Sequence, residues 1–131
     1  MEQKLINPWQ WQQQFSFSQG VEVSWAQRIL YCAGQASFNA EGGPLHAGDM
    51  RTQIPQAFDN LETVLTEAEF SLANVVRLNF NTTDVDRFLA EYDVVNNRLQ
   101  RAGCQPASTL LGVMRLALPE LLIEIEATAV K

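Results

Sequence analysis

The sequence predicts a single α+β domain in which two helices cover one face of a mixed β-sheet. Its 131 residues are close to the usual size of one domain, so the whole span 1–131 is expected to fold as a unit. Apolar residues make up 47% of the chain and charged residues 18%, which is typical of a folded protein. Segments of alternating apolar and polar residues are interspersed with two segments of helical periodicity. The expected order is β-β-α-β-α-β-β.

The first two strands are predicted before Gly34. Within residues 9–17, aromatic residues alternate with Gln and Ser, which indicates a strand with one buried face. Gly20 marks a bend or a bulge. The apolar run 28–33 predicts the second strand, and the segment 39–48 is so rich in turn-forming residues that it predicts a loop.

The first helix is predicted to begin at Asp49, a residue type that favours the N-cap, and to run to about residue 68. Apolar residues recur at helical spacing through this segment. Pro55 lies near the start of the helix, where a proline is tolerated best. Residues 75–81 alternate again between apolar and polar side chains and predict the third strand.

A second helix is expected after the capping residues 82–84, with apolar residues at helical spacing up to Leu99 and an end at Gly103. Residues 107–116 predict the fourth strand. Pro119 separates it from the last strand, 121–130, in which Ile and Ala alternate with Glu and Thr.

Several strands carry adjacent apolar residues, such as Ile29 with Leu30 and Leu110 with Leu111. A sheet that is covered on one side only should alternate more cleanly. Because no further element remains to cover the second face, we expect that face to be an interface between copies of the chain. The alternative is a central strand that is apolar on both sides within one small domain.

Charge and composition exclude several classes of function. The net charge is −6 and there is no basic run, which argues against a nucleic-acid partner. One His and two Cys cannot supply the four ligands of a structural zinc site, so no metal is expected. His46 is interpreted as a solvated loop residue. The N-terminus does not resemble a secretory signal, and no apolar run could span a bilayer, so a cytoplasmic protein without a membrane partner is expected.

Three short stretches could carry chemistry. Gly34 at a strand end would allow close backbone approach to another group, although a glycine there is more often only a turn. Glu124 and Glu126 would lie on one face of a strand, where shelter would raise the pKa of a carboxyl group and suit it to acid–base work. A solvated strand face is the alternative. Ser108 and Thr109 could bind a substrate or cap a turn.

Taken together, the chain resembles the RidA/YjgF family of reactive-intermediate deaminases, which also carries the name L-PSP endoribonuclease. The resemblance covers nearly the whole chain from about Phe15. It implies a chorismate-mutase-like fold and a homotrimer with small-molecule sites in the clefts between subunits. The segments that carry it are Ala33-Gly-Gln35, Gly48-Asp-Met50 with Gln53, Ala57-Phe-Asp-Asn-Leu61, Leu72-Ala-Asn-Val-Val-Arg-Leu78, Pro106-Ala-Ser108 and Ile123-Glu-Ile-Glu-Ala127.

The resemblance also implies a chemistry. Family members of the deaminase type hydrolyse imines and enamines such as 2-aminoacrylate, with no metal and no cofactor. An Arg grips the substrate carboxylate, and a Glu and a backbone group near a glycine place the attacking water. The corresponding glycine and glutamate are Gly34 and Glu124, whereas Ser108 stands at the arginine position. The remaining substrate-binding positions of the family correspond to Phe17, Tyr92 and Leu110.

The loss of the arginine shapes the functional prediction. A neutral Ser cannot make the charge-assisted pair, which is worth roughly 1.5–3 kcal/mol. On a regular strand Arg115 would point to the face opposite Ser108, so it is a poor replacement. We therefore expect a deaminase of an imine, enamine or related C–N substrate other than 2-aminoacrylate. Glu124 would act as general base or water anchor, while Ser108 and Tyr92 would shape specificity. The alternative is a non-catalytic ligand-binding or chaperone-like trimer.

Overall fold

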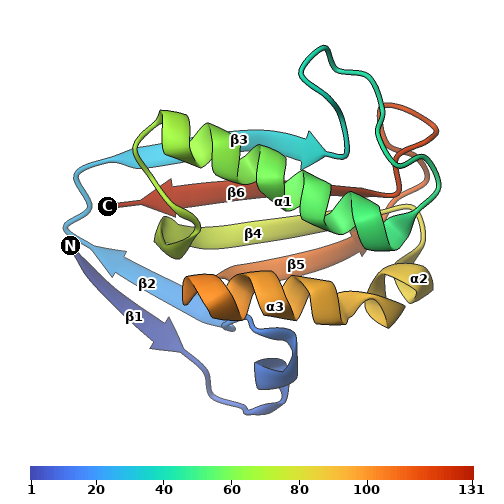
Figure 1. The fold of residues 1–131 in the computed structure, drawn as a ribbon. Coiled ribbons are helices and arrows are strands. Elements are labelled where there is room, and N and C mark those ends of the chain that lie inside the picture. Colours follow the sequence, from blue (N-terminus) through green and yellow to red (C-terminus); the bar gives the residue numbers. More distant parts are fainter.

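The computed structural model describes all 131 residues and contains a four-stranded sheet with helices packed on one face (Figure 1). The strand order in the sheet is β3-β6-β4-β5; β4 and β5 are parallel and the other neighbours are antiparallel. The α+β class and the mixed sheet are therefore confirmed. The strands are β3 (Ile29–Ala36), β6 (Ile123–Val130), β4 (Val75–Thr82) and β5 (Ala107–Gly112).

A separate two-stranded sheet lies beside β5 and α3 (Figure 1). It pairs β2 (Gly20–Ser24) with β1 (Glu2–Ile6), a strand that is absent from the expected order. Every residue of β1 is exposed, so the segment has no buried face and no alternation that could reveal it.

The strand predicted over residues 9–17 is wrong. Residues Trp11–Phe15 form a 3₁₀-helix, η1, and Ser16 follows in the left-handed region with φ of 58°. The aromatic rings still cluster: the ring centroids of Trp11 and Phe17 lie 5.7 Å apart in an edge-to-face arrangement. Ser16 Oγ donates a hydrogen bond to Asn96 Oδ1 at 2.8 Å. These tertiary contacts stabilise a compact turn where the local pattern favours an extended strand.

The helices begin at the predicted caps. Asp49 and Asp84 each accept a hydrogen bond from the backbone N–H three residues later, at the start of α1 (Met50–Glu67) and α2 (Val85–Ala90). The second predicted helix is in fact two helices, because the helical conformation is interrupted at Glu91 before α3 (Tyr92–Ala102). A single 3₁₀ turn, η2 (Leu72–Asn74), leads from α1 into β4.

The last two strands are shorter than predicted. Strand β5 ends at Gly112 and β6 begins at Ile123, so residues 113–122 form a connection. Arg115 belongs to this connection and is exposed. The prediction that Arg115 and Ser108 lie on opposite faces assumed one regular strand, and Arg115 is not part of that strand.

The core lies between the sheet and the helices. Its largest fully buried side chains include Phe58, Phe80 and Phe88. The other sheet face, here called the open face, keeps large apolar side chains in solvent: Tyr31 is 77% exposed and Leu111 is 54% exposed. No helix of the structure combines the length and apolar character that a membrane span requires.

One buried side chain connects α1 with the loop that precedes it and with the connection that leads into β6. Gln53 is fully buried, and its Nε2 donates hydrogen bonds to the carbonyl oxygens of His46 at 2.9 Å and Glu120 at 2.8 Å. Its Oε1 accepts a hydrogen bond from the backbone N–H of Leu122 at 2.8 Å. This amide fixes the backbone just before the strand that carries Glu124.

Replacing Gln53 by Met should destabilise the protein by about 3 kcal/mol or more. The substitution keeps the volume but removes three hydrogen bonds, each worth about 1 kcal/mol, and it leaves the N–H of Leu122 without a partner. The carbonyls of His46 and Glu120 still accept from the backbone N–H groups of Asp49 and Gly48. Urea unfolding at one fixed protein concentration measures the change. The control is Gln56→Met, one turn further along α1, where the amide bonds only to the Asn60 side chain. Equal stability of the two variants would contradict the role assigned to Gln53.

Candidate functional site

Gly34 and Glu124 lie against each other on neighbouring strands. A Cβ atom added to Gly34 would sit 1.9 Å from Glu124 Oε1, so any other residue at position 34 would displace this carboxylate from where it lies. The register of β3 and β6 shifts between Cys32 and Gln35, which is a β-bulge. A bulge leaves its extra residue out of the hydrogen-bond ladder and bends the strand. The bulge and the missing side chain together expose backbone next to the Glu124 carboxylate.

The sequence predicts that Glu124 and Glu126 share a face, and the structure confirms it. Ile123, Ile125 and Ala127 are buried under the helices, whereas the two glutamates point to the open face. Partial burial raises the pKa of Glu124 above the ordinary value for a glutamate, and the nearby negative charge of Glu126 raises it further. A carboxylate with a raised pKa is a stronger base near neutral pH.

The other four predicted site residues form a second group. Phe17, Tyr92, Ser108 and Leu110 line one cavity of about 200 Å³ on the helix side of the sheet. Sequence reasoning missed the rest of its lining, which comes from the misassigned η1 segment, from α2 and from the core. Those residues are Trp11, Phe15, Phe80 and Leu89. The dense aromatic content of residues 9–17 is the sequence feature that could have indicated this part of the lining.

The cavity contains one polar side-chain group without a partner. The Tyr92 hydroxyl donates a hydrogen bond to the carbonyl oxygen of Phe15 at 2.8 Å, and burial raises the pKa of this phenol. The Ser108 hydroxyl is buried and has no hydrogen-bond partner. Buried polar atoms in native structures normally have partners, so an unpaired hydroxyl in a cavity wall needs an explanation.

Within one chain, the two groups are held apart by the sheet. Ser108 is in register with Leu78 and Ala127, which are buried on the helix side. Glu124 is in register with Asn81 and faces the other way. The structure therefore brings Gly34 to Glu124 and brings Phe17, Tyr92, Ser108 and Leu110 together, but it does not join the two groups in a single copy.

No cation lies beside Glu124 in the chain. None of the ion pairs includes this residue. Arg77 is on the open face, but it donates a hydrogen bond to Thr109 Oγ1 at 2.7 Å and is in register with Thr128, four residues along β6 from Glu124. At about 3.3 Å per residue, this separation is about 13 Å.

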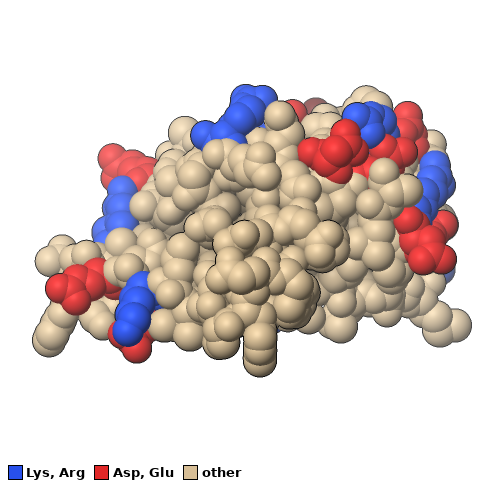
Figure 2. Space-filling view, turned by 90° about the horizontal axis from the view of Figure 1, so that it is seen from below, with Lys and Arg blue, Asp and Glu red and all other residues tan.

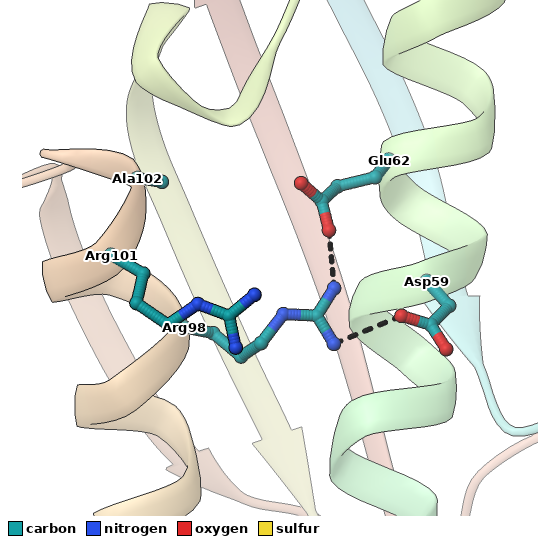
Figure 3. A pocket seen from close by; sticks show the side chains of 5 residues that line it. All are labelled: Asp59, Glu62, Arg98, Arg101 and Ala102. Atoms are coloured by element: carbon teal, nitrogen blue, oxygen red, sulfur yellow. Dashed lines mark hydrogen bonds and ion pairs between the residues drawn. The ribbon is translucent and has the colours of Figure 1, made fainter.

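A larger and more polar cavity, of about 400 Å³, lies between α1 and α3 (Figure 3). There the Arg98 guanidinium lies between two carboxylates, at 2.9 Å from Asp59 Oδ1 and in contact with Glu62. It also stacks over the Phe58 ring at 5.3 Å from the centroid. Because both carboxylates are already paired with Arg98, the cluster joins the two helices and offers no free acid or base.

The aromatic cavity is bordered by a side of the molecule that is poor in charge. Viewed from below, the centre and the lower middle of the surface carry almost no Lys, Arg, Asp or Glu, and these residues lie at the two ends and along the upper edge (Figure 2). The β1–β2 sheet and η1 lie on this side (Figure 1). Trp9 and Trp11 are more than half exposed, at 58% and 54%.

Comparison with known proteins places these features in a family. Residues 11–131 match the family described as endoribonuclease L-PSP. A RutC family protein of Aquifex aeolicus is 32% identical over 115 residues, 88% of each chain. A 2-iminobutanoate/2-iminopropanoate deaminase of Dermatophagoides farinae is 28% identical over 76% of this chain and 74% of its own. YyfB of Yersinia pestis, a member of the conserved Rid protein family, has a crystal structure that superposes with a TM-score of 0.87, at 36% identity over 100% of both chains.

The raised pKa of Glu124 predicts a pH-dependent effect of Glu124→Gln. The folded protein keeps a proton on Glu124 at pH values where the unfolded chain has lost it. The resulting stability is present below the unfolded-state pKa, about 4.3, and is lost as the pH rises through the folded-state pKa. The Gln variant is neutral throughout, so it should be more stable than the wild type at pH 7, and the difference should shrink toward pH 4.

Urea unfolding at both pH values tests this, with Glu67→Gln at the exposed end of α1 as the matched control. A gain in stability that is larger at pH 4 than at pH 7 would show that the pKa of Glu124 is not raised by folding.

Proposed function

Because this chain belongs to the RidA/YjgF family, also described as endoribonuclease L-PSP, we propose that it hydrolyses the C–N bond of an imine or enamine other than 2-aminoacrylate. The observation that carries the proposal is the contact between Glu124 and Gly34. A carboxylate with a raised pKa lies against backbone that no side chain covers. The deaminase name of one relative supports the same class of reaction.

The chemistry that this pair could perform is the addition of water to a C=N bond. The Glu124 carboxylate would take a proton from water as the water oxygen bonds to the carbon of the protonated imine, which gives a neutral aminoalcohol. Glu124 would then return this proton to the nitrogen. The C–N bond would break as the hydroxyl group loses its proton to solvent, releasing ammonia and a carbonyl compound. Backbone N–H groups at the bulge would stabilise developing charge, as preorganised donors do.

We propose that a complete site is built from two copies of the chain in a homotrimer. Glu124 and Gly34 on the open face of one copy would meet the cavity around Ser108 of its neighbour. The exposed apolar side chains of the open face, Tyr31 and Leu111, support such an assembly, because large apolar surfaces in solvent mark association sites. The small-molecule cleft would then lie between the subunits, and its two halves would be brought together only on assembly.

The second candidate is a non-catalytic ligand-binding or chaperone-like trimer. The observation that favours it is Ser108, which supplies no positive charge to hold a carboxylate. In that case the cavity would bind a small molecule without turning it over. A ribonuclease is disfavoured by the net charge of −6.

Glu124→Gln separates the enzyme from the binder. We expect the wild type to accelerate ammonia release from at least one imine made in situ by an amino-acid oxidase or supplied as a stable ketimine. Loss of a general base should lower this rate by about 100-fold or more. Aminoacrylate formed by a serine dehydratase should be hydrolysed only at the background rate. Glu67→Gln should retain full activity, and a melting curve checks that both variants are folded. Unchanged turnover in the Glu124 variant would refute the proposed mechanism.

A mixing experiment tests the site between subunits. Glu124→Gln and Leu110→Trp, which fills the cavity, should each be inactive alone. When the two variants are unfolded together and refolded as mixed trimers, about a quarter of the sites should combine an intact Glu124 with an intact cavity, given random assembly of a cyclic trimer. Recovery of about a quarter of the wild-type rate is expected. No recovery, with mixed assembly verified by mass spectrometry, would mean that the two half-sites do not meet between copies.

A further inference from the structure

We infer that the cavity lined by Phe17, Tyr92, Ser108 and Leu110 binds an uncharged, ring-sized apolar group that carries one hydrogen-bonding atom. The binding preference follows from the cavity alone, but its consequence for the substrate rests on the proposed function. If the cavity holds the side group of the substrate, that substrate is the imine of a neutral aromatic or cyclic carbonyl compound, and not the imine of a 2-oxo acid.

The lining of the cavity argues for an uncharged occupant. Seven of its eight lining residues are hydrophobic, and the eighth is Ser108. No Lys, Arg, Asp or Glu lines it, and the neighbouring surface over η1 is also poor in charge (Figure 2). A carboxylate placed here would lose its hydration without gaining a cation, which is strongly unfavourable.

The volume sets the size of the group. The cavity measures about 200 Å³. In another protein an apolar cavity of about 150 Å³ holds a benzene molecule, so this one has room for a single ring with a small substituent. Drug-sized ligands occupy pockets of about 300–1,000 Å³, which are larger than this cavity.

The arrangement of the rings favours a flat apolar group. Trp11 and Phe17 pack edge to face at 71°, and Phe15 and Tyr92 do so at 83° with their centroids 5.4 Å apart. A further ring can join such a set by edge-to-face contacts, which add about 0.5–1.5 kcal/mol per pair beyond burial. An aromatic wall can also attract an organic cation, so a cationic probe belongs in the test.

The one available polar partner is the Ser108 hydroxyl. Its oxygen is buried and unpaired, whereas the Tyr92 hydroxyl is already engaged with the Phe15 carbonyl. A ligand hydroxyl, carbonyl or imine nitrogen beside the ring would pair with Ser108 Oγ. This single contact gives the cavity a preferred orientation of the ligand, with its polar atom toward β5.

Three probes that share one benzene ring measure the preference: benzyl alcohol, toluene and benzoate. Ligand-detected NMR and quenching of Trp fluorescence report binding to the wild-type protein. We expect benzyl alcohol to bind more tightly than toluene and at least tenfold more tightly than benzoate. Ser108→Ala should weaken benzyl alcohol about fivefold, the value of one neutral hydrogen bond, and leave toluene unchanged. Leu110→Trp should abolish binding of all three, while Thr66→Trp on the exposed side of α1 should not.

Two outcomes of these binding measurements would overturn the inference. Tighter binding of benzoate or tetramethylammonium than of benzyl alcohol would show that the cavity selects a charged ligand. Equal changes in the affinities for benzyl alcohol and toluene on Ser108→Ala would show that the hydroxyl takes no part in ligand recognition. As a positive check, Ser108→Arg should reverse the order and favour benzoate, because a guanidinium pairs with a carboxylate.

The same probes separate this inference from the proposed reaction. Binding is measured also in Glu124→Gln, which lacks the proposed base but keeps the cavity. Retained binding of benzyl alcohol in a protein that hydrolyses no imine would refute the reaction and support the cavity. If the protein instead hydrolyses acetophenone imine no faster than the imine of pyruvate, and Leu110→Trp leaves both rates unchanged, the reaction stands and the assignment of the cavity is wrong.

Discussion

The buried amide of Gln53 is the constraint on which the candidate site depends. Its three hydrogen bonds join the start of α1 to the carbonyls of two loops and to the backbone N–H of Leu122. Strand β6 begins one residue later and carries Glu124 two residues after that contact. A side chain on a helix thereby sets where a strand starts. Because successive strand residues alternate between faces, it also sets which face receives the carboxylate.

The sheet divides the candidate chemistry between its two faces. The open face carries a carboxylate with a raised pKa against a glycine, and the helix side carries an aromatic cavity with one unpaired hydroxyl. Neither half has the parts of a complete site, since the first lies outside the aromatic cavity and the second has no base. If assembly joins the halves as proposed, the same open face would serve both association and chemistry.

Much of the architecture is predictable from local patterns. Asp49, Asp84 and Gly103 mark helix ends because their side chains or backbone conformations satisfy the end groups of a helix directly. The alternation in β4 and β6 reports burial of one face. The same reasoning fails for residues 9–17, where aromatic residues occupy four odd-numbered positions and predict a strand. The segment Trp11–Phe15 instead forms a 3₁₀-helix, and the Ser16 that follows it bonds to α3. This reasoning also misses β1, which has no buried residue to create a pattern.

The sequence by itself determined the α+β class, the helix caps, the pairing of Glu124 with Glu126 on one face and, through resemblance, the six candidate site residues. These features depend on neighbours along the chain or on recurring motifs. Only the tertiary structure decided that Gly34 makes room for Glu124, that Trp11 and Phe15 complete a cavity with Ser108, and that the two groups lie on opposite faces. Each of these depends on the register between strands distant in sequence, and the spacing of residues along one segment carries no information about that register.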